Sequence, residues 1–80
     1  DFVVPSRTGS PILVQSCESL ADARTRKREV SALGEAMREL GCMAGTIVTR
    51  AEDERIDTDS GTIKVVPIWK FLLVLPEATE

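Results

Sequence analysis

Three residues near the start of the chain have types and a spacing that suggest metal-dependent chemistry. Asp1 opens one expected strand, and the next expected strand carries Gln15 and Cys17, two positions apart. Residues two apart on a strand project from the same face. A magnesium-dependent nuclease uses Asp followed by Asp/Glu-x-Lys in this arrangement: the carboxylates bind the metal that activates water, and the lysine helps to place that water.

Two of these three positions depart from the nuclease chemistry. Gln15 is a neutral amide where a second acid is needed, and Cys17 is a thiol where a positive charge is needed. Magnesium prefers carboxylate oxygens and does not favour sulfur. We therefore expect a degenerate site at Asp1, Gln15 and Cys17, with no metal bound.

A basic cluster is the second candidate site. Arg24, Lys27 and Arg28, together with Arg26, lie in the first turns of an expected helix. Arg24 and Arg28 are one turn apart on one face, so both are candidates to contact nucleic-acid phosphates. A solvated helix surface is the simpler alternative. Cations near a helix N-terminus oppose the helix dipole, and this conflict raises the weight of the functional interpretation.

Several other kinds of chemistry are excluded by residue type. The chain has no His, which rules out His-based triads and typical zinc sites within it. Its glycines form no phosphate-binding pattern. The segment 57–61 (Asp-Thr-Asp-Ser-Gly) is similar to a calcium loop, but Ile68 stands at the twelfth position, where that loop needs Glu. A hairpin tip explains the segment without a metal.

The composition indicates one small globular domain. The 80 residues are 42% hydrophobic and 29% charged, and a chain of this length supports only a modest core. A net charge of −3 gives no overall attraction to nucleic acid or anionic lipid. The longest apolar run, Ile68–Leu75, is far shorter than the roughly 20 residues of a membrane span. We expect a cytoplasmic protein in which Cys17 and Cys42 are reduced thiols.

The first half of the chain predicts a strand–helix–strand crossover. Strands at Asp1–Val4 and Ile12–Gln15 are expected to form a hairpin. A helix over about Leu20–Leu40 follows, and parallel pairing of Ile12–Gln15 with a strand at Thr46–Thr49 is expected. Ser19 or Asp22 can cap the helix and Gly41 can end it. Its expected buried stripe consists of Val30, Leu33, Met37 and Leu40.

The second half predicts a hairpin and a short helix. Strands at Arg55–Thr58 and Thr62–Val66 flank the turn residues 59–61. Pro67 is expected to be the first helical residue. The apolar helix Ile68–Leu75 is expected to be buried on the sheet or against a partner, and Pro76–Glu80 is expected to be a frayed tail. The predicted fold class is α/β: a mixed sheet with a strand–long helix–strand crossover, plus a hairpin and a short C-terminal helix.

Several segments, in this order and spacing, also carry a resemblance to a known family. The specific ones are 25–30 (Thr-Arg-Lys-Arg-Glu-Val) and 65–72 (Val-Val-Pro-Ile-Trp-Lys-Phe-Leu), supported by 1–4, 12–17, 33–40 and 63–64. Nearly the whole chain resembles the C-terminal domain of unknown function found in bacterial and archaeal AAA-type ATPases. The resemblance implies a restriction-endonuclease-like, PD-(D/E)xK-like core. Some members of that fold carry the lysine on the following helix, which makes Lys27 an alternative source of it here. The resemblance also implies that residues 1–80 are a single fragment, whose upstream ATPase part binds ATP and magnesium.

The sequence thus predicts a non-catalytic module of an AAA-type ATPase that serves binding or regulation and holds no cofactor of its own. A chain that begins within a strand at Asp1 suggests that an upstream part completes the sheet. The expected partners are that ATPase domain and further copies of the chain in a homo-oligomer, with nucleic acid as another candidate and no membrane. One alternative is a magnesium-dependent DNA nuclease using Asp1, Gln15 and upstream acids. Another is self-association through Ile68–Leu75.

Overall fold

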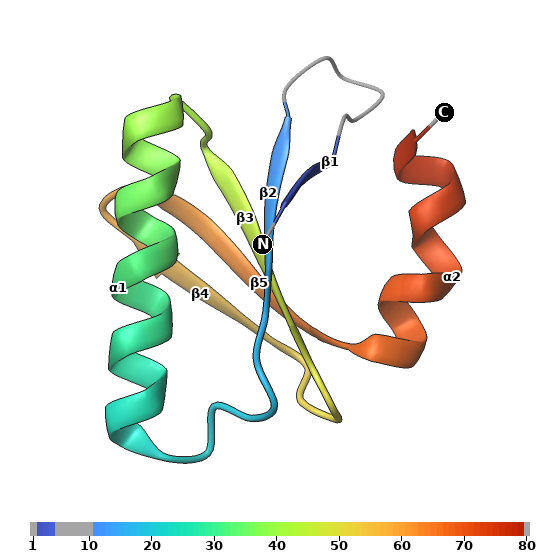
Figure 1. The fold of residues 1–80 in the computed structure, drawn as a ribbon, viewed down its shortest axis with the longest axis horizontal. Coiled ribbons are helices and arrows are strands. Elements are labelled where there is room, and N and C mark those ends of the chain that lie inside the picture. The colour runs from blue at the N-terminus through green and yellow to red at the C-terminus, as the bar shows by residue number, and fades with distance from the viewer. Residues whose placement is uncertain (1, 5–10, 80) are drawn as a thin grey trace.

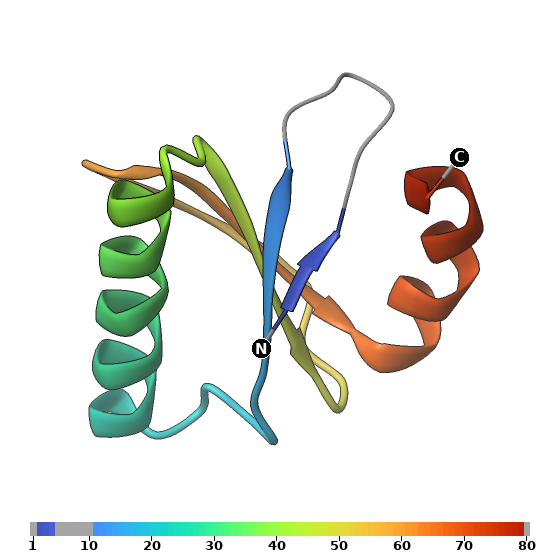
Figure 2. The same cartoon turned by 45° about the horizontal axis from the view of Figure 1, so that its top comes forward.

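Two helices lie on opposite faces of one mixed sheet in the computed structural model, which describes residues 2–4 and 11–79 (Figures 1 and 2). The elements follow in the order β1 (Phe2–Val4), β2 (Ile12–Ser16), α1 (Ala23–Leu40), β3 (Ala44–Thr49), β4 (Glu54–Thr58), β5 (Gly61–Pro67) and α2 (Ile68–Thr79). No helix in this described part is long and apolar enough to cross a membrane.

The sheet has the strand order β1-β2-β3-β5-β4. Its three central strands are parallel, and the two edge strands β1 and β4 run antiparallel to their neighbours. Helix α1 connects β2 to its parallel neighbour β3, as the sequence predicted. The α/β class, the mixed sheet and the parallel pairing are therefore confirmed.

Helix α1 begins and ends at residues that satisfy its free backbone groups. Asp22 Oδ1 accepts hydrogen bonds from the backbone N–H groups of Arg24 (2.8 Å) and Thr25 (3.4 Å). At the other end Gly41 adopts a left-handed conformation with φ of 69°, which glycine adopts without steric cost. The helix starts at Ala23, later than the predicted Leu20, because Asp22 is the capping residue. Leu20 is nevertheless buried, in the segment before the cap.

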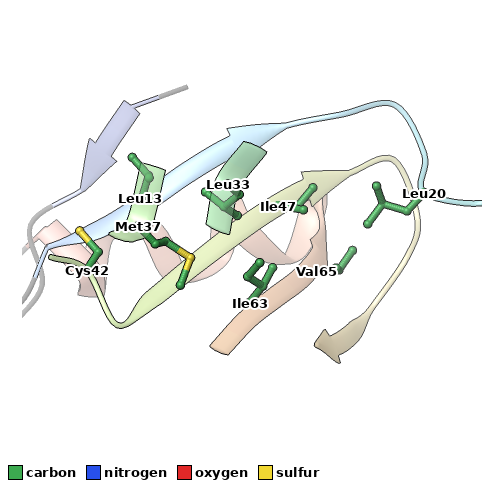
Figure 3. Packing of buried hydrophobic residues seen from close by; sticks show 8 residues of the cluster. All are labelled: Leu13, Leu20, Leu33, Met37, Cys42, Ile47, Ile63 and Val65. Atoms are coloured by element: carbon green, nitrogen blue, oxygen red, sulfur yellow. The ribbon is translucent and has the colours of Figure 1, made fainter. Parts of the chain in front are cut away.

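The main core lies between α1 and the sheet (Figure 3). Leu33 and Met37 are fully buried, as predicted, and Val30 packs partly buried at the margin. The prediction for Leu40 is wrong, because this side chain is 59% exposed. Met37 already lies over Gly45, near the start of β3, so Leu40, about one turn further along α1, lies beyond the N-terminal end of that strand. The other buried members are Leu13, Leu20, Cys42, Ile47, Ile63 and Val65.

The β4–β5 hairpin has the predicted turn. Its tip holds a hydrogen bond from the Ser60 N–H to Thr58 Oγ1 (3.2 Å) and another from that hydroxyl to the Gly61 carbonyl (2.9 Å). Gly61 has φ of 140°, and a Cβ there would lie 2.2 Å from the Met43 carbonyl oxygen. The turn therefore requires glycine, which explains the calcium-loop-like segment without a metal.

The opposite face of the sheet has a much smaller core. Val14 and Val48 are buried there, with Phe71 of α2 packed against them. Helix α2 begins at Ile68, after Pro67, which ends β5 and is not the first helical residue. The helix continues to Thr79, so the predicted frayed tail is helical almost throughout. The expected burial of this helix was on the sheet or against a partner: Phe71 packs on the sheet, whereas four large apolar side chains on the outer face are exposed in the single chain, namely Ile68, Trp69, Leu72 and Leu73.

Candidate functional site

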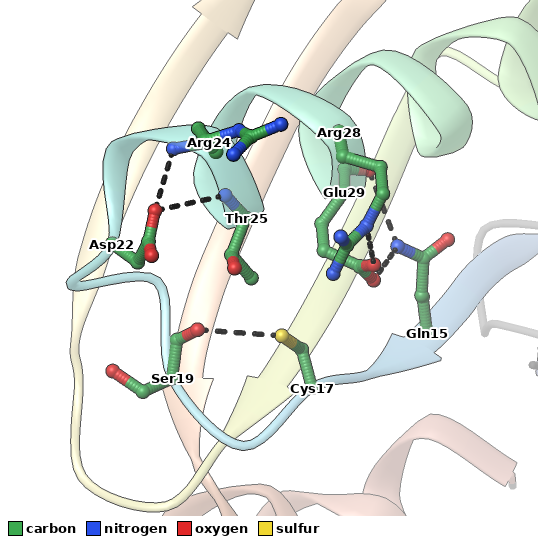
Figure 4. Close-up of polar contacts among 8 residues, drawn as sticks. All are labelled: Gln15, Cys17, Ser19, Asp22, Arg24, Thr25, Arg28 and Glu29. Atoms are coloured by element: carbon green, nitrogen blue, oxygen red, sulfur yellow. Dashed lines mark hydrogen bonds and ion pairs between the residues drawn. The ribbon is translucent and has the colours of Figure 1, made fainter.

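Gln15 joins strand β2 to helix α1 (Figure 4). It is buried on the face of the sheet that α1 covers. Its amide Nε2 donates one hydrogen bond to the Glu29 main-chain oxygen (3.2 Å) and another to Glu29 Oε1 (2.7 Å). An ionised acid at position 15 has no hydrogen to donate and could make neither bond. The amide is therefore suited to a structural link rather than to binding a metal.

Glu29 is the hydrogen-bond partner of Gln15, and sequence reasoning did not predict it. Its second oxygen, Oε2, accepts a hydrogen bond from Arg28 Nε at 3.4 Å, so both carboxylate oxygens have protein partners. The signal was its position four residues before Leu33, which predicts a place near the sheet-facing side of the helix. The strand residue that it meets depends on how the helix crosses the sheet, and the spacing does not encode this.

Cys17 lies just beyond β2 and packs partly buried against the main core, on the same side of the sheet as Gln15. Its Sγ donates to the Ser19 carbonyl oxygen at 3.4 Å. The shared face expected from the two-residue spacing is thus observed, but the two side chains have different partners. Both Cys17 and Cys42 are free thiols. Asp1, the third member of the predicted site, lies outside the described residues.

Magnesium does not fit the described part of this site. It needs several oxygen ligands in near-octahedral order. The Gln15 amide nitrogen points at the one carboxylate beside it, Glu29, and Cys17 offers only sulfur. No group of three or more Asp, Glu, Cys or His side chains within residues 2–4 and 11–79 could hold a metal ion.

The basic cluster on α1 is partly neutralised by acids. Arg26 makes a two-pronged ion pair with Glu54 on β4, with Nη1–Oε2 and Nη2–Oε1 distances of 2.8 and 2.6 Å. Hydrogen bonding to the partner raises the pKa of Arg26 and lowers the pKa of Glu54. Arg28 is paired with Glu29.

The three residues predicted to contact nucleic acid, Arg24, Lys27 and Arg28, are all exposed. The side chains of Arg24 and Lys27 have no ion-pair partner in the described part of the chain. They are therefore the strongest remaining candidates for a phosphate contact.

A groove of about 490 Å³ lies on the other face of the sheet, beside α2. Its floor is mainly apolar, and a group of charged side chains lines it as well. It is lined by Ile12, Val14, Thr46, Lys64, Val66 and Phe71, and also by Asp53, Glu54, Arg55 and Lys70. Sequence reasoning assigned no role to this face.

Comparisons with known proteins found no matching family model, curated protein or solved structure.

Proposed function

We propose that this chain is a non-catalytic, restriction-endonuclease-like module that an AAA-type ATPase carries as a binding element. The observation that carries the proposal is the outer face of α2. Ile68, Trp69, Leu72 and Leu73 follow the i, i+1, i+4, i+5 spacing of one helical face, and they are 45%, 61%, 58% and 71% exposed. We call these four residues the α2 stripe. A contiguous apolar patch of this kind marks a protein interaction surface.

The Gln15–Glu29 contact argues against the enzymatic alternative. The nuclease hypothesis needs position 15 to offer oxygen to a metal, whereas both hydrogens of its amide are used to hold α1 on β2. A Lys27 moved onto the helix would have to reach that site, but Lys27 is exposed. Gln15 and Lys27 therefore favour a structural role for this region over a catalytic one.

The order of elements agrees with the family that the sequence resembles. A hairpin (β1–β2), a long helix and a strand parallel to the second hairpin strand form the crossover expected of a nuclease-like core. The β4–β5 hairpin extends this core at the far edge and leads directly into α2. The α2 stripe is thus attached to the sheet through β5.

The ATPase attachment is tested by the reading frame upstream of Asp1. We expect it to encode Walker A and Walker B motifs in the same polypeptide. An upstream frame without a nucleotide-binding motif would contradict the proposal.

Trp69 reports on binding because it is the only tryptophan in the chain. Adding the separately produced ATPase part of the polypeptide, made tryptophan-free, should shift Trp69 emission to the blue as the indole leaves water. The double variant Leu72→Glu/Leu73→Glu should abolish the shift, whereas Ser31→Glu, on exposed α1 surface, should not. If the stripe instead forms dimers of this chain alone, sedimentation will show a dimer that the double variant dissociates, and self-association will be the better account.

A further inference from the structure

We propose that the groove beside α2 binds a small amphipathic carboxylate, with its apolar body on the sheet and its charged end at Lys64. The proposed ligand site lies between α2 and the sheet, whereas the α2 stripe faces outward. The inference therefore goes beyond the proposed docking function and does not depend on it.

The groove has the size and lining of a small-molecule site. Its volume of about 490 Å³ lies within the range of roughly 300–1,000 Å³ that is common for such sites. Val14, Val66 and Phe71 give it an apolar floor and wall. An apolar ligand body would cover Ile12, Val66 and Phe71, which are only partly buried around the small core of this face.

The polar side of the groove is a row of residues across four strands. Val14 of β2 pairs with Thr46 of β3, Thr46 pairs with Lys64 of β5, and Lys64 pairs with Arg55 of β4. Residues that pair directly point to the same face of a sheet. The register therefore sets two cations and a hydroxyl beside an apolar floor.

The charges in this row are not balanced. Arg55 donates to Asp57 at 3.1 Å, and Lys70 pairs with Asp53 at 2.9 Å. Glu54 is engaged by Arg26. Lys64 has no ion-pair partner among the described residues, and the residue directly opposite it, Arg55, carries the same charge.

Like charges in directly opposed positions destabilise a sheet. An anion between Lys64 and Arg55 would remove this repulsion. Thr46 is half-buried, and its hydroxyl has no hydrogen-bond partner in the described part of the chain, so it can donate to the same anion. A net positive charge at this point is notable in a chain whose net charge is −3. The site therefore selects a ligand that has both a carboxylate and an apolar body.

Three probes separate the two requirements in a ¹H–¹⁵N NMR titration of the whole chain. Octanoate has both the tail and the charge, octanol has only the tail, and acetate has only the charge. We expect octanoate to shift the amide signals of Val14, Thr46, Lys64 and Val66, with much weaker effects from the other two. Absence of these shifts below the micelle concentration of octanoate would overturn the proposal.

Variants at position 64 test the role of the charge. Lys64→Met keeps the apolar stem and should weaken octanoate binding about tenfold, the scale of a lost charged hydrogen bond, while octanol is unaffected. Lys64→Arg should restore binding, and Lys27→Met, an exposed cation on α1, should bind octanoate like the wild type. Equal weakening of octanol and octanoate, or shifts confined to the α2 stripe, would overturn the site. Shifts of the groove residues on raising protein concentration alone would mean that a second copy fills it.

Discussion

Gln15 Nε2 lies 2.7 Å from Glu29 Oε1, and this hydrogen bond ties the second strand of the sheet to the long helix that covers it. A further bond from the same nitrogen to the Glu29 main-chain oxygen gives the contact two anchor points. In an active nuclease of the kind that the sequence resembles, position 15 would carry a carboxylate for a metal. Here its amide stabilises the packing of α1 on β2, and this difference underlies the first prediction.

Replacing the Gln15 amide with a carboxylic acid should destabilise the fold. Gln15→Glu removes both donated hydrogen bonds and places a second carboxylate against Glu29 on a buried face. We expect a loss of about 1–3 kcal/mol in the free energy of unfolding at pH 7, measured by urea denaturation. The loss should shrink as the pH falls, because protonation of one of the two carboxyls removes the repulsion between them.

Gln15→Met is the matched control for this experiment. It has a similar shape and lacks the amide, so it should lose about 1 kcal/mol with no recovery at low pH. If Gln15→Glu is as stable as wild type at pH 7, the amide has no structural role, and position 15 is again a candidate metal ligand.

The Arg26–Glu54 ion pair should give a small coupling energy that depends on pH. Both side chains are more than one-third exposed, so solvent screens the pair, and we expect a coupling of about 0.2–1 kcal/mol from an Arg26→Met/Glu54→Gln double-mutant cycle at pH 7. The pair lowers the folded pKa of Glu54. Its stabilisation is therefore present above the unfolded value of about 4.3 and is lost as the pH falls through the folded value.

The Arg50–Glu18 pair is the control for that cycle. Its Nη1–Oε1 distance is 3.5 Å and its side chains are 80% and 77% exposed, so its coupling should be near zero at every pH. Equal coupling energies in the two cycles would show that the two-pronged geometry of Arg26 adds nothing.

Two glycines should respond in opposite directions to alanine. At Gly61 a Cβ would meet the Met43 carbonyl oxygen at 2.2 Å, and φ is 140°, so Gly61→Ala should cost about 3 kcal/mol or more. At Gly34, inside α1, the nearest outside atom is Ser60 Oγ at 3.6 Å, so Gly34→Ala should stabilise by about 0.5–1 kcal/mol. Thermal unfolding of the two variants checks both signs, and a neutral Gly61→Ala would contradict the described turn.

Nucleic-acid binding, if it uses the basic cluster on α1, should be weak and sensitive to salt. Two or three phosphate contacts give a slope of roughly −2 to −3 in a plot of log affinity against log salt concentration. Fluorescence anisotropy with a labelled DNA duplex should show binding at low salt that Arg24→Glu/Lys27→Glu abolishes, because these two exposed cations have no ion-pair partner among the described residues. Binding that persists in this double variant would show that the cluster is not the contact.

The parts of the fold that sequence predicted correctly have local signals. Asp22 marks the start of α1 because its side chain accepts hydrogen bonds from free N–H groups of the first turn. Gly41 marks the end because its left-handed backbone lets the chain satisfy the last free carbonyl groups. The turn at Gly61 follows from glycine's access to positive φ. The parallel crossover follows from the length of α1 between two short apolar strands.

The parts that sequence missed depend on register and on element length in space. Leu40 has the right helical phase for burial but lies beyond the N-terminal end of β3. The contact of Gln15 with Glu29 and the row of Thr46, Lys64 and Arg55 exist only because particular strand positions align. Hydrophobicity likewise predicted that α2 is buried on the sheet or against a partner, and it could not show that the sheet covers only the face of the helix that carries Phe71.

A DNA-cleavage assay most directly tests the central proposal, that this chain serves as a non-catalytic module. The chain is incubated with supercoiled plasmid or single-stranded DNA in the presence of magnesium or manganese, beside Asp1→Ala and Gln15→Met. We predict no metal-dependent cutting by any of the three proteins, because position 15 donates hydrogen bonds to Glu29 and offers no carboxylate. Metal-dependent cutting by the wild type that disappears in Asp1→Ala would contradict the account.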